Sequence, residues 1–549
     1  MSGFFKHIIL ISGIFCNSFI SFSQSYCKLS VSTTVTVVDG ASFQAGDTIC
    51  IQPGVRNFLL FRNLIGTAES PITIINVDGK VIIDTDAYYG IKFSGCKYVR
   101  MLGNNIVSER YGIFIRRVGN GAGISVDDMS TNVELANIEI SYTAIAGIYA
   151  KTDPNCNSFV ATRDKFTMYD IKIHDCYLHD IQDEGMYIGS TKFTGQYIEA
   201  CDTTVLPHII HGVKVYNNIV ERTGWDGIQV SSTPTDCEIY GNIVRNDSWR
   251  ETPNQMSGII IGGGSVCDCY NNIIMDGIGD GIDIFGSNEM RIFNNLIIRA
   301  GRTFYPGDPA YPRHGIFFGN PPDGSFASLA IIFNTIIQPK TTGIRFFNEN
   351  TTGNLIHNNI VCEPGAFADN GNDAYFNHNL QSSQFTLSDN YFTNDIGTVH
   401  FVDIQSDIYD LKANSPAINK AIDLGYSGVL FDIENRSRPF NAGFDIGAYE
   451  CHEVDAGIDA KNEIGDCLLL FPNPASESVS FSTKYPVNED YSISLINMYG
   501  QYLIPNQVTL NLDNNRFYVN IAGFKKGFYI IRFFSANYQG SGKLFINNE

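Results

Sequence analysis

One recurring position in the middle of the chain carries side chains that are able to transfer protons. It directly precedes a repeated glycine, and its occupants in successive repeats are Glu184, Asp226, Ser257, Asp280, His314 and Thr342. A second position lies two residues after the same glycine and holds Tyr187, Gln229, Ile260, Asp283, Phe317 and Arg345. Carboxyl and imidazole groups are the usual general acids and bases of enzymes. If the repeats stack, these two series predict a site in which such groups lie side by side.

The repeats themselves indicate how these residues are positioned. A glycine followed by an aliphatic residue opens a short alternating run at Gly90, Gly112, Gly147, Gly185, Gly227, Gly258, Gly281, Gly315 and Gly343. Between these runs, a second aliphatic run follows an asparagine at Asn105, Asn137, Asn218, Asn242, Asn272, Asn295 and Asn359, with Cys176 and Thr335 in the same slot. Such strict alternation with steps as short as 22 residues (Gly90 to Gly112) predicts a solenoid.

The strands of this solenoid are predicted to be β, because polar and apolar residues alternate with a period of two. We therefore expect an all-β chain, a right-handed parallel β-helix solenoid followed by a small C-terminal β-sandwich. Glycine permits a tight turn at the start of a strand. Asparagine tolerates the left-handed conformation at a corner and forms hydrogen-bonded ladders when it stacks. The asparagines are thus interpreted as structural.

The beginning of the solenoid carries a family resemblance. Residues 43–54 (Phe43-x-x-Gly46-Asp47-x-Ile49-x-Ile51-x-Pro53-Gly54), followed by Gly66-Thr67 and Ser70-Pro71, resemble the opening of β-helix proteins related to pectate lyases. The resemblance extends over residues ~26–400 and implies the right-handed parallel β-helix fold.

The ends of the chain predict further segments. Residues 1–23 have the charged, apolar and small-residue pattern of a signal peptide, so the β-helix is assigned to residues 24–400. Residues 401–451 resemble the closing segment of bacterial β-helix surface proteins and are interpreted as a structural cap over the last coil, in which Arg438 pairs with Asp445 or Glu450. Residues 452–466 are polar and predict a linker.

Residues 467–549 predict a separate β-sandwich with alternating strands. The motif residues Pro472, Asn473, Pro474, Gly527 and Lys543, at the extreme C-terminus, resemble the sorting domain of the Bacteroidetes type IX secretion system. The resemblance implies contact with that secretion machinery and a protein that is secreted or held at the outer-membrane surface. A carbohydrate-binding sandwich is the alternative.

Composition excludes several classes of partner. With 37 basic and 57 acidic residues the net charge is −20, which excludes a nucleic-acid binder. No segment after the leader is apolar over the length that spans a bilayer, and we expect a monomer. Twelve of the 13 cysteines follow the leader, and in an exported protein they permit disulfides. Cys237 and Cys267 occupy one column of adjacent coils, and Cys156 and Cys201 lie in neighbouring inserts, so both pairs are predicted to be bonded.

The stacked columns predict a site for polysaccharide. Strand spacing puts Glu184 about 5 Å and Asp280 about 10 Å from Asp226 at the backbone. Both separations are compatible with paired carboxyl groups of a glycosidase, so these three are the predicted catalytic residues. The predicted substrate-binding residues are Tyr187, Trp225, Gln229, Arg313, His314 and Arg345. Alternatively, Asp280 and Asp283 hold calcium, or the acidic column is only turn chemistry.

Two functions follow from these alternatives. The first is an enzyme, a glycoside hydrolase or a uronate polysaccharide lyase. For a lyase the resemblance implies a Lys or Arg base and neutralisation of the uronate charge, and Lys214, Arg222 and Arg313-His314 are the candidates. The second is a non-catalytic glycan-binding or adhesion protein on the same scaffold. No cofactor is predicted apart from the calcium ion.

Overall fold

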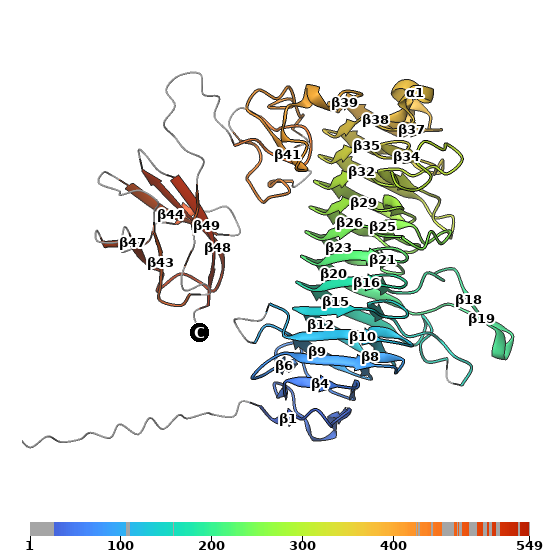
Figure 1. Cartoon of the computed structure of the whole chain (residues 1–549), viewed down its shortest axis with the longest axis vertical. Helices are drawn as coiled ribbons and strands as arrows, with labels where there is room; N and C mark the ends of the chain where they lie inside the picture. The colour runs from blue at the N-terminus through green and yellow to red at the C-terminus, as the bar shows by residue number, and fades with distance from the viewer. Residues whose placement is uncertain are drawn as a thin grey trace, which may run out of the picture. The chain divides into compact units, whose positions relative to one another are not determined.

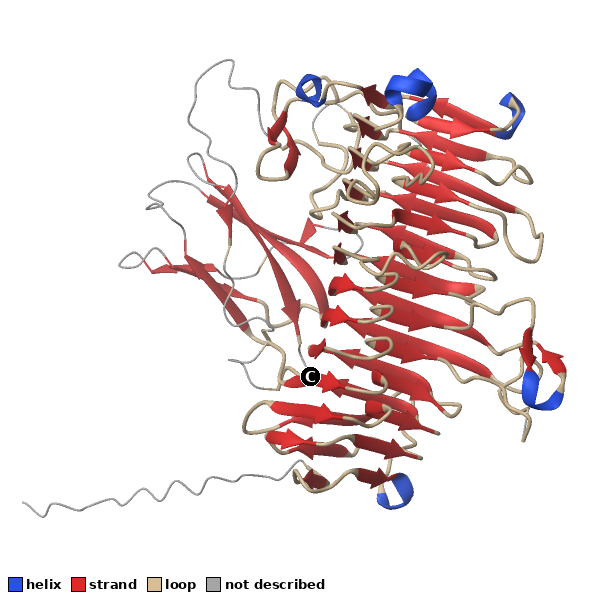
Figure 2. Ribbon diagram, turned by 45° about the vertical axis from the view of Figure 1, so that its right-hand side comes forward, coloured by secondary structure: helices blue, strands red, loops and turns tan. Residues whose placement is uncertain are grey.

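The computed structural model describes residues 27–547, apart from 106–109, 158, 424, 426–428, 441–442, 453–465, 469, 471–474, 483–490, 498–501, 504, 506–507, 512–515 and 536–538. The chain divides into two compact units, Met1–Cys451 and His452–Glu549. The first unit is a stack of coils that is almost entirely β (Figures 1 and 2). The predicted signal peptide, most of the linker and the motif residues Pro472, Asn473 and Pro474 lie outside the described residues.

Each coil contributes one strand to each of three parallel sheets, which we name A, B and C. Sheet A contains β1 (Leu29–Val31), β3 (Thr48–Ile51), β6 (Ile72–Asn76), β9 (Lys97–Leu102), β12 (Thr131–Ala136), β15 (Thr167–His174), β20 (Ile209–Tyr216), β23 (Thr235–Tyr240), β26 (Cys267–Tyr270), β29 (Asn288–Phe293), β32 (Ala327–Ile332), β35 (Asn354–His357) and β38 (Phe385–Ser388). Sheet B contains β2 (Val37–Asp39), β5 (Leu59–Arg62), β8 (Tyr89–Ser94), β11 (Ala122–Asp127), β14 (Ile148–Ala150), β17 (Met186–Ile188), β22 (Ile228–Val230), β25 (Ser257–Ile261), β28 (Asp280–Ile284), β31 (Ile316–Phe318), β34 (Ile344–Phe346) and β37 (Phe376–His378). Sheet C contains β4 (Gly54–Arg56), β7 (Val81–Thr85), β10 (Ile113–Val118), β13 (Ile138–Ser141), β16 (Tyr177–Ile181), β21 (Ile219–Thr223), β24 (Ile243–Arg245), β27 (Ile273–Met275), β30 (Leu296–Ile298), β33 (Thr335–Ile337), β36 (Ile360–Cys362) and β39 (Tyr391–Thr393).

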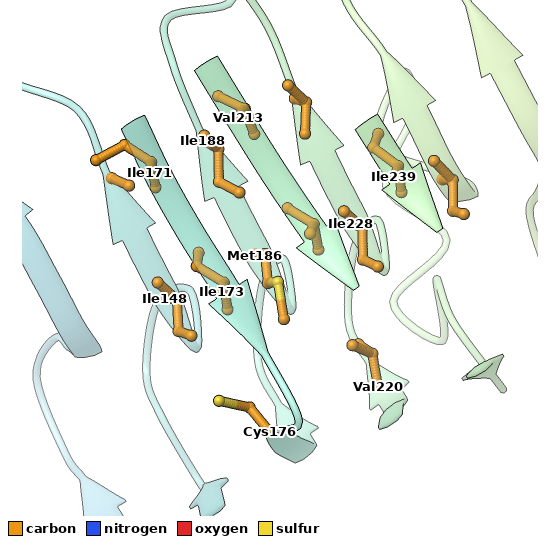
Figure 3. Packing of buried hydrophobic residues seen from close by; sticks show 14 of the residues in the cluster. Ile148, Ile171, Ile173, Cys176, Met186, Ile188, Val213, Val220, Ile228 and Ile239 are labelled. Atoms are coloured by element: carbon orange, nitrogen blue, oxygen red, sulfur yellow. The ribbon is translucent and has the colours of Figure 1, made fainter. Parts of the chain in front are cut away.

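The core of the solenoid is a column of aliphatic side chains between the three sheets. Ile148 and Met186 of sheet B face Ile171 and Ile173 of sheet A across the interior (Figure 3). The alternation in sequence places every second side chain of a strand inside, which is why the period of two predicted these strands. The residues between them point outward and are available for function.

The sequence assigned two roles to one asparagine, the left-handed corner and the hydrogen-bonded ladder. In the structure two adjacent residues take these roles. The residue before each rung, such as Asn217, Asn271 or Asn294, has a positive φ. The next residue forms the ladder, because each rung donates its backbone N–H and Nδ2 to Oδ1 of the rung above, as between Asn242 and Asn272 (both 3.0 Å). The rungs are Asn218, Asn242, Asn272, Asn295, Asn334, Asn359 and Asn390.

Gly112 was wrongly assigned to the glycine series of sheet B. It directly precedes β10 of sheet C, and Gly123 is the glycine of that coil in sheet B.

Assignments in the asparagine series were also wrong or missed. Asn334, and not Thr335, is the rung of its coil. Asn137 has a φ of 57° and lies in the left-handed column one residue before the rung position. Asn390 extends the ladder beyond Asn359. In each case the predicted ladder position was wrong by one residue or the ladder was predicted one coil too short. The sequence alignment of the repeats does not show which of two adjacent residues adopts the left-handed conformation at the corner.

Residues 401–451 pack along the side of the coils, and not over their end as the sequence analysis expected. Outward aliphatic side chains of sheet C, such as Leu296, Ile337 and Ile360, form one cluster with Phe401 and Tyr449. This segment begins with the hairpin of β40 (Phe401–Asp403) and β41 (Ile408–Leu411), and the 3₁₀ turn η5 (Ile396–Val399) directly precedes it. This segment covers the apolar outer face of sheet C in the last coils (Figure 1).

The end of the solenoid is closed by short elements. These are α1 (Phe367–Asn370) and the 3₁₀ turns η3 (Gly371–Ala374) and η4 (Ser382–Gln384), while η1 (Gly40–Ser42) follows the first strand of sheet B. Phe367, Phe385 and Phe392 pack against the last residues of the core. Within the described residues no helix has the length and apolar character needed to cross a membrane.

The second unit has its own core, which includes Phe481, Phe517 and Phe533. Its larger sheet contains β42 (Asp466–Cys467), β49 (Gln539–Ile546), β48 (Gly527–Ser535), β44 (Tyr491–Asn497) and β45 (Tyr502–Leu503). Its smaller sheet contains β43 (Ser478–Ser482), β47 (Arg516–Asn520) and β46 (Val508–Asn511). Both the all-β class and the separate C-terminal β domain were predicted from the sequence.

Candidate functional site

The two predicted columns lie side by side at sheet B. The ladder register aligns Tyr149, Tyr187, Gln229, Ile260, Asp283, Phe317, Arg345 and Asn377 on eight successive strands. At the start of the same strands, Ser257 pairs with Asp280, and the carbonyl of Asp226 accepts the N–H of Gly185 (3.0 Å). The fold therefore brings the proton-transferring residues onto adjacent coils.

Asp226 is the most enclosed acid of this site. Its side chain is fully buried, and Oδ1 accepts hydrogen bonds from the N–H (2.8 Å) and the hydroxyl (2.7 Å) of Ser257. Its Oδ2 is buried and has no hydrogen-bond partner among the described residues. Burial, with the nearby carboxyl groups of Glu184 and Asp247, raises the pKa of Asp226 well above its usual range. Burial therefore favours the protonated form of Asp226.

Glu184 and Asp280 stand on either side of Asp226 in the column. Burial raises the pKa of Glu184 to about 7. Asp280 accepts a hydrogen bond from the N–H of His314, and its Oδ2 lies 3.6 Å from the guanidinium of Arg313. Burial raises the pKa of Asp280, whereas Arg313 opposes that rise, so this acid is more readily ionised than a buried carboxyl group without a cation.

Asp283 faces outward two residues after the repeat glycine. Its Oδ1 is buried and has no hydrogen-bond partner in the described part of the chain. Burial and the neighbouring Asp280 and Asp226 raise its pKa well above the usual range. Gln229, in the same column, is 1% exposed and has an Nε2 that is likewise without a partner there. Buried polar atoms without partners are costly, and they are typical of sites that a ligand completes.

Asp247 is a fifth acid of the site, and it was not predicted from the sequence. It lies in the irregular connection between β24 and β25 and is 1% exposed. The hydroxyl of Ser248 donates to its Oδ1 (2.7 Å), and burial raises its pKa to about 6. A Cβ atom at Gly277 would lie 1.9 Å from its Oδ2, so glycine is required there. Its position depends on an insert that follows no repeat, so no sequence pattern pointed to it.

His314 and Arg345 border the acids on the C-terminal side. Burial and the cationic Arg345 and Arg313 lower the pKa of His314 to about 3, so its imidazole is neutral. Its Nδ1 is hydrogen-bonded to the hydroxyl of Thr342. Arg345 donates to the side-chain oxygen of Asn377 (2.5 Å). These groups are able to orient a ligand by hydrogen bonds.

Two aromatic residues among the predicted binding groups flank the acids. Trp225 is partly buried beside Asp226, with an indole Nε1 that has no partner in the described residues and with the guanidinium of Arg250 5.9 Å from its ring. Tyr187 lies on the N-terminal side, and its ring packs edge-on against Tyr149 at 5.4 Å. Aromatic rings of this kind provide flat apolar surface to a sugar ring.

Two of the candidate lyase bases are not part of this face, which corrects the sequence interpretation. Lys214 is on sheet A and pairs with Glu238 (2.8 Å). Arg222 is on sheet C and pairs with Asp180 (2.7 Å). The side chains were close to the repeat in sequence, but a coil turns them onto other sheets. Of the three candidates only Arg313 lies beside the acids.

No group of three or more His, Cys, Asp and Glu side chains among the described residues is arranged to hold a metal ion. Calcium at Asp280 and Asp283 therefore stays a prediction. The structure has disulfides at Cys237–Cys267 and at Cys156–Cys201, the two pairs that were expected. A third disulfide, Cys27–Cys50, was not foreseen, because Cys27 precedes the first repeat.

The family models match two parts of the chain. Residues 208–395 match the model described as "Right handed beta helix region". Residues 469–547 match the model described as "Secretion system C-terminal sorting domain". No protein of curated function matches the sequence.

Solved structures resemble the chain at low identity. The crystal structure of pectate lyase Pel9A is 12% identical, with 77% of this chain and 96% of that chain covered and a TM-score of 0.44. An alginate lyase from Paenibacillus sp. str. FPU-7 is 14% identical (58% and 98% covered, TM-score 0.37). A GH136 lacto-N-biosidase from Eubacterium ramulus is 12% identical (64% and 62% covered, TM-score 0.36). Likenesses this low carry no argument about the reaction.

The sheet topology and the two family models agree with the resemblances seen in the sequence. The chain is a right-handed parallel β-helix followed by a type IX secretion sorting domain, and it is a secreted or cell-surface protein.

Proposed function

We propose that the solenoid is a glycoside hydrolase that cleaves polysaccharide at the acidic face of sheet B. The observation that carries this proposal is the group of buried carboxyls, Asp226, Asp247, Asp280 and Asp283, of which three have buried oxygens without a partner among the described residues. Neighbouring acids whose environments separate their pKa values are typical of general acid and base pairs. A purely structural turn column would have its buried oxygens satisfied.

The roles follow from the environments. Burial raises the pKa of Asp226 and so favours its protonated form, which makes it the general acid that donates its proton to the glycosidic oxygen as the bond to the anomeric carbon breaks. Asp280, beside Arg313, is the base that takes a proton from the water attacking that carbon. The water oxygen becomes the new hydroxyl, and the acid and the base exchange protonation states.

The spacing predicts the stereochemical outcome. Asp226 and Asp280 are two coils apart, about 10 Å at the backbone, with Ser257 at the intervening position of the column. Inverting glycosidases need such a separation, whereas retaining enzymes need about 5 Å. We therefore expect inversion at the anomeric carbon.

The test is cleavage of a panel of neutral and acidic polysaccharides. Asp226→Asn and Asp280→Asn are each expected to lower kcat about 100-fold or more, while binding is retained. The matched control is Asp268→Asn, because Asp268 lies on sheet A and pairs with Arg291 (2.5 Å). NMR of the first product shows the anomer formed.

Three results would contradict the proposal. If a glycan is bound but none in the panel is cleaved, the protein is a non-catalytic binder. If cleavage produces the ultraviolet absorbance of an unsaturated uronate, it is a lyase. If both variants keep full activity, the acidic column is structural.

A further inference from the structure

A pocket of about 440 Å³ opens on the outer face of sheet B, on the N-terminal side of the acids. Its floor is Tyr187 of β17, in the same column as Asp283. Its wall includes Gln196 and Tyr197 of β18 (Gln196–Ile198), which forms a hairpin with β19 (Thr203–Val205) that stands out from the coils (Figure 1). The pocket is separate from the carboxyl groups that carry the proposed reaction.

The polar groups of the pocket are arranged as donors and acceptors. Lys151 is 7% exposed, and its Nζ donates to Oδ1 of Asp153 (2.9 Å) and to the hydroxyl of Tyr187 (3.5 Å). The same ammonium lies 4.6 Å from the centre of the Tyr187 ring. Oε1 of Gln196 is buried and lacks a hydrogen-bond partner in the described chain. An ion pair, an amide and phenol rings match a molecule with several hydroxyl groups and an apolar face.

The wall is held in place by covalent and packing contacts. The tip of the hairpin contains the 3₁₀ turn η2 (Glu199–Cys201), and Cys201 is bonded to Cys156 of the preceding insert. Nearby, the guanidinium of Arg163 lies 4.2 Å from the centre of the Phe193 ring and donates to the Phe193 carbonyl (2.5 Å). A wall fixed in this way reduces the entropy lost when a ligand is bound.

We propose that this pocket binds a pyranose residue of the same glycan chain that is cleaved at Asp226 and Asp280. This inference rests on the proposed function and adds to it the direction and length of the substrate. The strand of Tyr187 lies one strand spacing, about 5 Å, from the coil of Asp226 and three spacings, about 14 Å, from the coil of Asp280. The glycan therefore lies along the axis of the solenoid, across the strands, and must be several sugar residues long to fill both places.

The test compares long and short ligands. In the Asp226→Asn chain, calorimetry measures binding of the hexasaccharides and the disaccharides of cellulose, xylan, homogalacturonan and alginate. Tyr187→Ala and Gln196→Ala are each expected to weaken the best hexasaccharide about tenfold and to leave its disaccharide unchanged. Neutral and uronic hexasaccharides are separate arms, because both contain the ring and hydroxyl groups that the pocket recognises.

The control is Tyr169→Ala, the same change at a 46% exposed tyrosine of sheet A. If both pocket variants bind the hexasaccharide as tightly as the parent chain, the pocket inference is overturned, while cleavage by the wild type leaves the proposed function intact. If the wild-type chain cleaves none of the four hexasaccharides and the Asp226→Asn chain binds none, the proposed function and the inference are both overturned.

Discussion

Burial at the acidic face affects the stability of the solenoid as well as its chemistry. The pKa of Glu184 rises from 4.5 to about 7 because its carboxyl group is buried. The folded state therefore holds a proton that the unfolded chain has already released between these two values. A raised carboxyl pKa contributes stability below the unfolded pKa, and that contribution is lost as the pH rises through the folded pKa.

This linkage predicts the behaviour of Glu184→Gln. In the wild type, Glu184 should lower the free energy of unfolding by about 3 kcal/mol as the pH rises from 4.5 to about 7. The glutamine variant cannot ionise, so its stability should fall less over this range. Urea unfolding at about pH 5 and about pH 8 measures the difference.

The exposed Glu289→Gln is the control and should follow the wild type. Equal pH dependence in wild type and Glu184→Gln would show that the Glu184 carboxyl group is not buried as described.

The sequence predicted those residues of the site that occupy equivalent positions of the repeat. Asp226, Asp280 and Asp283 could be identified by their distance in sequence from the repeat glycine, because residues at the same distance from that glycine are aligned in successive coils. Asp247 could not, since it enters from an irregular insert. Tyr149 and Lys151 could have been found by extending the column of Tyr187 one coil further, because Gly147-Ile148-Tyr149 has the same phrase.

Among the elements, the asparagine ladder holds the corners of the coils together. Oδ1 of Asn272 accepts two hydrogen bonds from Asn242, and its Nδ2 donates to the carbonyl of Ile239 (2.9 Å). All of these atoms belong to buried residues. A buried donor that loses its acceptor keeps its full desolvation cost.

Asn272→Ala is accordingly expected to lower the free energy of unfolding by about 3 kcal/mol, since the backbone N–H of Asn242 loses its acceptor and its Nδ2 keeps only the bond to the carbonyl of Val215. Chemical denaturation measures the change. Asn379→Ala removes an exposed asparagine that is bonded to Glu349 and should change stability little. Similar losses in the two variants would contradict a structural role of the ladder.

Residues 401–451, which we call the side segment, contain a buried ion pair. Arg438 and Glu450 are both fully buried, with a nitrogen–oxygen distance of 3.2 Å, and Arg438 also donates to the carbonyls of Asp445 (3.0 Å) and Gly447 (2.7 Å). The sequence left the partner of Arg438 open between Asp445 and Glu450, and the structure has the pair with Glu450. The sequence did not show that the segment lies beside sheet C, because the outward aliphatic residues of sheet C look like core residues in the sequence.

Arg438→Met should destabilise the side segment by about 3–5 kcal/mol, because it leaves Glu450 buried without its cation. Limited proteolysis within residues 401–451 and thermal unfolding measure the effect. Arg62→Met removes an exposed pair with Asp39 and should change stability little. Proteolysis at the same rate in Arg438→Met and wild type would be the contrary result.

For the whole molecule, the two units have separate cores and are expected to fold independently. A chain that ends after Cys451 should keep the thermal unfolding transition of the solenoid, because none of the core residues of the solenoid is removed. It should also fail to leave the cell, because it lacks the sorting domain. Cell fractionation and calorimetry measure the two effects, and export of the truncated chain would contradict the assigned role of the C-terminal unit.

The fold of the whole molecule was predictable because a repeat shows its architecture many times over. The position of the pocket was not, since its wall comes from two inserts of unrelated sequence. The connection between the two inserts was visible only as a pair of cysteines, Cys156 and Cys201. Regular coils thus determine where a ligand site can lie, and inserts determine its shape.

The asparagine ladder also bears on how such a protein changes in evolution. Each rung satisfies the rung below and is satisfied by the one above, as Asn242 does between Asn218 and Asn272. Duplication or deletion of one full coil keeps every buried amide bonded, whereas a change of part of a coil breaks the ladder. The scaffold can therefore gain or lose whole coils, and each change would lengthen or shorten its outer face by one strand spacing.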